Sequence, residues 1–175
     1  MFVIIPGFVV SAVTFPGVIV HEAAHMLFCR LRRVAVLDVC FFRFGNPSGY
    51  VIHENTEDFP TTFLVSVGPF IVNSLLCMLI CFPAFLPVKV FGILNLPSLF
   101  LLWLGVSIGM HAFPSTGDAR NLLAQAKKAA GEMNPLAIIS YPIVVLIYIA
   151  NALSVIWFDA IYGLAIGLGL PALFL

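Results

Sequence analysis

Residues 18–30 read Val18-Ile-Val-His21-Glu22-Ala-Ala-His25-Met-Leu-Phe-Cys-Arg30 and place an H-E-x-x-H pattern inside an apolar run. On a helix, positions i and i+4 share one face, so both imidazoles can bind one metal ion. Glu22 lies off that face but close enough to take a proton from water at the metal. The alternative is a buried, hydrogen-bonded histidine pair beside a carboxylate. We favour a functional site, because three ionisable groups in an apolar helix are costly.

The composition indicates a polytopic α-helical membrane protein. Of the 175 residues, 62% are hydrophobic and 9% are charged, whereas a soluble domain carries about 25% charged residues. The mean hydropathy is +1.12. The formal net charge is zero, which argues against a nucleic acid partner. The length fits a single membrane-embedded domain over residues 1–175.

Apolar runs predict about five transmembrane helices. The first covers residues 3–29, and we expect it to be retained, because no basic segment precedes it and no small-residue cleavage site follows it. It is interrupted by prolines and glycines at positions 6, 7, 16 and 17. The others are expected at residues 61–83, 90–112, 135–157 and 160–175, the last being short for a crossing.

The second predicted span contains Gly68-Pro69 and, near its middle, Asn73. A Gly-Pro pair and a buried amide indicate a close helix approach and a polar contact. The alternative is a kinked helix whose Asn73 hydrogen-bonds to the backbone of a neighbouring helix. These residues alone favour neither interpretation.

Residues 34–60 differ from the spans on either side. Residues 34–39 and 50–53 have the β-branched and aromatic composition of strands, and residues 44–49 form a turn sequence rich in Gly, Asn, Pro and Ser. We therefore expect a short β-hairpin or small sheet between the first two helices, at the membrane surface or dipping into it.

The basic residues orient this arrangement. Seven of the eight fall on one side of the predicted spans, namely Arg30, Arg32, Arg33, Arg43, Arg120, Lys127 and Lys128, and Lys89 falls on the other. An excess of Lys and Arg marks the cytoplasmic side. We expect a multi-pass integral membrane protein with an extracytoplasmic N-terminus and its site near the cytoplasmic side.

Catalytic zinc has three protein ligands and one open position, so a third ligand is needed. The candidates are Asp118, His111, His53 and Glu54. Asp118 is favoured, because it follows the third predicted span on the same side of the membrane as the histidine pair. Its alternative role is structural, since Ser115-x-x-Asp118 also fits a capping box at the start of a helix.

The chain resembles the site-2 protease family of intramembrane zinc metalloproteases over about residues 15–125. The H-E-x-x-H of residues 21–25 matches that family's first motif, and residues 68–73 look like its Gly-Pro-x-x-x-Asn segment. Residues 41–53 look like its intervening strand region. The family's third motif is Asn-x-x-Pro followed by Leu-Asp-Gly. Here His111 replaces the Asn, the spacing is one residue shorter and Ala119 follows Asp118.

The resemblance implies an enzyme, a metalloendopeptidase with one Zn²⁺ per chain bound by His21, His25 and Asp118. It implies that Glu22 is the general base and that Asn73 contacts the substrate backbone or orients the reacting carbonyl. Residues 135–175 would be accessory helices. The partners would be a membrane-spanning protein substrate and the lipid bilayer, and we expect substrate choice to involve a regulatory membrane partner or a homo-oligomer.

Two other functions use the same residues. One is a binding or scaffold protein that performs no hydrolysis, and the other is a metal or ion transporter. Glu22 favours the enzyme, because a pure binding site needs no base at that position.

Overall fold

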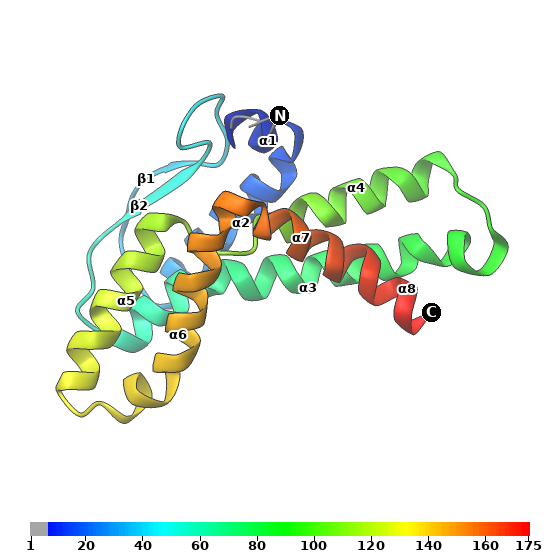
Figure 1. Cartoon of the computed structure of the whole chain (residues 1–175). Helices are drawn as coiled ribbons and strands as arrows, with labels where there is room; N and C mark the ends of the chain where they lie inside the picture. Colours follow the sequence, from blue (N-terminus) through cyan, green and yellow to red (C-terminus); the bar gives the residue numbers. More distant parts are fainter. Residues whose placement is uncertain (1–6) are drawn as a thin grey trace.

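The computed structural model describes residues 7–175, so residues 3–6 of the first predicted span lie outside the described part (Figure 1). Eight α-helices and one small antiparallel sheet follow in chain order. They are α1 (Gly7–Val13), α2 (Phe15–Leu31), β1 (Val36–Cys40), β2 (Tyr50–His53), α3 (Phe59–Phe91), α4 (Leu96–Met110), α5 (Thr116–Gly131), α6 (Pro135–Leu153), α7 (Phe158–Leu164) and α8 (Leu170–Phe174). A 3-10 turn (Ser154–Ile156) follows α6, and a π-helical turn (Ala165–Gly169) joins α7 to α8.

Two helices are long and apolar enough to cross a membrane, namely α3 and the helix Pro135–Ile156. A third crossing results if α1 and α2 count as one span, but these two are bent by 90°. Helix α4 and the run Phe158–Phe174 are shorter apolar helices. The predicted α-helical fold is thus confirmed, and two to three helices within residues 7–175 are long and apolar enough to cross a membrane. The fuller set of five stays a prediction.

Local signals explain where the helices begin and end. Asp58 caps α3 by accepting a hydrogen bond from the Thr61 backbone N–H, and α3 continues past its predicted end at residue 83 to a left-handed Gly92. Asn95 caps α4 in the same way, accepting from the Ser98 N–H. Pro97 follows at the first turn, where the missing N–H has no partner to lose. Helix α4 therefore begins later than the span predicted from residue 90.

The predicted hairpin is present between α2 and α3. Strands β1 and β2 pair antiparallel, with Cys40 opposite Tyr50, Val39 opposite Val51 and a register shift between Val36 and Asp38. The strands lie within two residues of their predicted positions. Both contact α2, so the turn of residues 44–49 stays close to the helix that carries the H-E-x-x-H pattern.

Helix α3 runs through the middle of the molecule, with α4 beside it, α2 across it, and α5 and α6 packed at its N-terminal part (Figure 1). One apolar core lies between α3, α5 and α6 and includes Leu122, Ala126 and Val144. A second, between α3 and α4, contains Cys77 and Cys81.

Helix α2 approaches α4 closely at Gly17. A Cβ atom at this position would collide with the backbone carbonyl of Ser107 and lie 2.6 Å from the ring of His111. Only glycine fits such an approach without displacing the backbone. The contact sets α2 against the end of α4 and so positions His21 against the chain around His111.

Candidate metal centre and cleft

The two histidines of the H-E-x-x-H pattern lie on one face of α2. The Nε2 atoms of His21 and His25 are 3.1 Å apart, and both side chains are buried. Helix α2 is regular here, so the i, i+4 spacing brings the two rings together as the sequence predicts.

Asp118 from α5 joins this pair. One oxygen of its carboxylate lies 3.5 Å from Nε2 of His25, and one ligand atom from each of His21, His25 and Asp118 can be chosen so that all three lie within 4.8 Å of one another. In a tetrahedral zinc site with metal–ligand distances of about 2.0–2.2 Å, the ligand atoms lie about 3.3–3.6 Å apart. The 3.1 Å and 3.5 Å spacings come close to this geometry and the donor set suits zinc, so the three residues could hold a metal ion.

A second hydrogen bond fixes the orientation of His21. Its Nδ1 lies 2.7 Å from the backbone carbonyl oxygen of His111. A carbonyl can only accept, so Nδ1 carries the proton and the lone pair of Nε2 faces His25 and Asp118. Metal-binding histidines are commonly oriented by a second-shell acceptor of this kind.

Asp118 serves both of the roles suggested by its sequence. Its backbone N–H donates to the hydroxyl of Ser115, which caps α5, and that hydroxyl donates to the Asp118 carboxylate at 2.6 Å. Burial raises the pKa of Asp118, but the neighbouring His25 and the Ser115 hydroxyl outweigh burial and hold it well below its usual range. His25, with a smaller contribution from the capping hydroxyl, therefore keeps the carboxylate ionised beside the histidines.

The other candidate ligands lie elsewhere. His111 contributes its backbone carbonyl, and its ring Nε2 pairs with the Thr14 hydroxyl at 2.8 Å. His53, at the end of β2, faces the carbonyl of Glu54. Among residues 7–175, the one group of three or more potential metal ligands that converge is His21, His25 and Asp118.

Asn73 lies behind the histidines and is fully buried. Its amide nitrogen donates to the carbonyl oxygens of His111 at 2.9 Å and Ile108 at 3.1 Å. It is not among the described residues that line the cleft next to the metal centre. The Asn73 amide thus hydrogen-bonds to the backbone of a neighbouring helix, which is the alternative interpretation given from the sequence.

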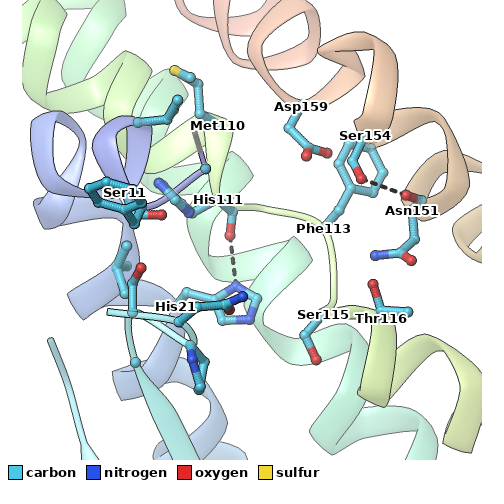
Figure 2. Close-up of a pocket in the computed structure, with 18 of the residues that line it drawn as sticks. Ser11, His21, Met110, His111, Phe113, Ser115, Thr116, Asn151, Ser154 and Asp159 are labelled. Atoms are coloured by element: carbon cyan, nitrogen blue, oxygen red, sulfur yellow. Dashed lines mark hydrogen bonds between the residues drawn. The ribbon is translucent and has the colours of Figure 1, made fainter. Parts of the chain in front are cut away.

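Glu22 and His21 line a cleft of about 680 Å³ between α1, α2, the hairpin turn, the chain after α4, and the α6–α7 segment (Figure 2). Glu22 is 8% exposed. The hairpin turn covers it closely, because a Cβ atom on Gly49 would lie 2.8 Å from Cγ of Glu22. Glu22 therefore lies at the wall of the cleft beside His21 of the candidate metal centre.

The sequence analysis missed the opposite wall of this cleft. That wall carries Asn151, Ser154 and Asp159 (Figure 2). Asp159 lies between the spans predicted at residues 135–157 and 160–175, outside every motif of the sequence. Its signal was an acidic side chain among apolar residues, which is unusual near a membrane unless the side chain has a role.

Comparison of the chain with models of protein families, with curated proteins and with solved structures gives no match. The functional argument therefore depends on the site itself and on the motifs in the sequence.

Proposed function

We propose that this protein is an intramembrane zinc metalloprotease that hydrolyses peptide bonds of membrane-spanning or membrane-associated proteins. The observation that carries the proposal is the convergence of His21, His25 and Asp118 within 4.8 Å, with Glu22 directly beside them on the cleft. A pure binding site has no need of a carboxylate at the second position of the H-E-x-x-H pattern.

Metal binding and proton transfer are assigned to different residues of the chain. His21, His25 and Asp118 would hold zinc, which supplies Lewis acidity and lowers the pKa of water to about 7. Glu22 takes the proton of the attacking water and passes it to the leaving amine. The apolar surroundings exclude bulk water, which strengthens these charge interactions.

A helical substrate must unwind into an extended segment at the site, because the backbone carbonyls of a helix are occupied by its own hydrogen bonds. A two-stranded sheet has an unpaired edge on each strand, so the hairpin beside the cleft offers backbone groups that can hold such a segment. The cleft volume of about 680 Å³ lies within the range of ligand sites, about 300–1,000 Å³.

The proposal includes an orientation in the membrane. Exposed apolar side chains, among them Leu79, Phe91, Ile139 and Leu146, are suited to contact lipid. Lys128 pairs with Glu57 beside the start of α3, whereas Lys89 lies near the other end of that helix. We place the N-terminus outside the cytoplasm and the hairpin inside it. Labelling of a Ser48→Cys variant only from outside would contradict this.

The decisive experiment compares wild type with Glu22→Gln. Gln keeps the shape of Glu but does not accept the proton at neutral pH, so zinc should stay bound while cleavage is lost. Cleavage of a panel of membrane-spanning peptides is measured in liposomes, with zinc quantified in the same samples. Glu132→Gln, an exposed position at the end of α5, is the matched control and should cleave normally.

If Glu22→Gln cleaves peptides at the wild-type rate, Glu22 is not the general base and the protease proposal is wrong. If wild type binds zinc and cuts no peptide of the panel, the result favours a scaffold. Zinc movement across the liposome membrane would instead favour a transporter.

A further inference from the structure

The cleft wall opposite His21 carries a carboxylate oxygen without a partner. Asp159, in α7, faces the cleft (Figure 2), and its Oδ1 is buried and has no hydrogen-bond partner among the described residues. A buried acceptor left unpaired costs free energy, and more so when it is charged. Oδ1 of Asp159 would therefore be stabilised by a hydrogen-bond donor on a bound ligand.

Two polar neighbours on the same wall use donors in hydrogen bonds within the chain. Asn151 donates one of its two amide N–H groups to the carbonyl of Pro114 at 2.9 Å. Ser154 donates its hydroxyl to the carbonyl of Asn151 at 2.7 Å. The amide oxygen of Asn151 and the hydroxyl oxygen of Ser154 are left as acceptors. This wall thus presents mainly hydrogen-bond acceptors, which suit a ligand group that carries several hydrogen-bond donors.

The charge of the cleft favours the same kind of group. Its lining includes Glu22 and Asp159 and, among the described residues, neither Lys nor Arg. A zinc ion would be balanced by Asp118 and Glu22, so the charge of Asp159 stays uncompensated. A cleft of one sign of charge attracts ligands of the opposite sign.

We propose that Asp159, Asn151 and Ser154 form a subsite for a basic side chain, the ammonium of Lys or the guanidinium of Arg, on the polypeptide segment bound in the cleft. An ammonium brings three donors and a guanidinium five, and neither brings an acceptor. The occupant is a substrate segment, so this assignment rests on the proposed function, and Asp159 acts in substrate selection rather than in the chemical step.

The test measures binding separately from cleavage. Zinc-loaded Glu22→Gln protein is titrated with fluorescent Leu/Ala peptides of about 20 residues that carry either Lys or Gln at one position, which is moved along the peptide. At the position that meets the subsite, the Lys peptide should bind on the order of tenfold more tightly than the Gln peptide. Adding Asp159→Asn should abolish this preference.

Two further variants complete the test. Asp159→Glu keeps the charge and should keep the preference for Lys, which guards against a misfolded Asp159→Asn. Glu132→Gln removes an exposed carboxylate at the end of α5 and should change nothing. Equal binding of Lys and Gln peptides at every position, or an unchanged preference in Asp159→Asn, would overturn the subsite.

Cleavage of the same peptides by the protein with Glu22 intact separates this proposal from the proposed function. A preference for Lys that depends on Asp159, without any cleavage, would leave the subsite standing and count against the protease. Cleavage of Lys and Gln peptides at equal rates, without a binding preference, would support the protease and rule out the subsite.

Discussion

Asn73 of α3 and His111 at the end of α4 are joined by a 2.9 Å hydrogen bond from the amide nitrogen to the backbone carbonyl oxygen. The same oxygen accepts a hydrogen bond from Nδ1 of His21 at 2.7 Å. One carbonyl therefore links a buried amide to an imidazole of the candidate metal centre. Asn73 also donates to the carbonyl of Ile108, which fixes the last turn of α4 against α3.

We predict that Asn73→Ala weakens zinc binding by about 10-fold, the lower end of the 10- to 100-fold effect of losing a group hydrogen-bonded to a metal ligand, because Asn73 acts only through the His111 carbonyl. The His111 carbonyl would move, and His21 would lose its orientation. The variant should also unfold more easily, by about 1–3 kcal/mol, because buried carbonyls lose their donor. Zinc affinity is measured by competition with a chelator.

Asn95→Ala is the control for Asn73→Ala. It removes a helix cap at the far end of α4 and should cost about 1 kcal/mol of stability with zinc affinity unchanged. Wild-type zinc affinity in Asn73→Ala would show that the link through His111 does not orient His21.

We predict that Asp118→Asn loses zinc but keeps the fold of the metal-free protein. The backbone N–H of residue 118 still donates to Ser115, so the cap of α5 survives, while the anionic ligand is gone. Thr116→Pro is the control and should keep both zinc and the fold, because a proline at the first helical position is tolerated and the carboxylate remains. Metal analysis and thermal unfolding without metal distinguish the two roles of Asp118.

We predict that Gly49→Ala slows cleavage while zinc stays bound. The new methyl group would lie 2.8 Å from Cγ of Glu22 and 2.9 Å from Cγ1 of Val18, so either the hairpin turn or the side chain of Glu22 must shift. A displaced base typically costs on the order of 10²-fold in rate. Gly131→Ala is the control, because a Cβ atom there meets nothing within 4 Å. Equal rates in wild type and Gly49→Ala would show that the turn moves away from Glu22 during turnover.

The contact between the end of α2 and the start of α3 should depend on pH. Hydrogen bonds from Thr61, then from Arg32, lower the pKa of Asp58, against a smaller opposing effect of burial. A lowered pKa means that the stabilisation is complete above the ordinary aspartate value of about 3.9 and is lost as the pH falls through the lowered value. The difference in Tm between wild type and Asp58→Asn should therefore shrink in acid. A difference that grows in acid would contradict this account.

Much of the site was predictable because its signals are local. The H-E-x-x-H spacing places His21 and His25 together on any helix, and the residues before Asp118 already carry a helix start. The hairpin followed from its strand composition and its turn residues. In each case a few neighbouring residues decide the local geometry.

The rest depends on contacts between distant segments. Whether Asn73 faces a substrate or a neighbouring backbone is decided by where α4 ends, which no local pattern specifies. The part that Asp159 plays in the cleft depends on how α7 packs against the chain after α4. The second span was predicted to end at residue 83, yet α3 continues through Pro83 and Pro87 to Phe91 and packs against α4, where neighbouring helices let membrane helices tolerate such prolines.

The unequal lengths of α3 and α4 have a consequence for the surrounding lipid. Helix α3 has 33 residues and α4 has 15, which correspond to about 50 Å and 22 Å. The two are joined at one end by a short turn. In the proposed membrane orientation, with this turn at one surface of a hydrocarbon layer about 30 Å thick, the free end of α4 with His111 would stop short of the opposite surface. Hydrophobic mismatch of this kind thins the adjacent leaflet. A thinned leaflet would shorten the path of water to Glu22, and acyl-chain length would then set how readily the site is hydrated.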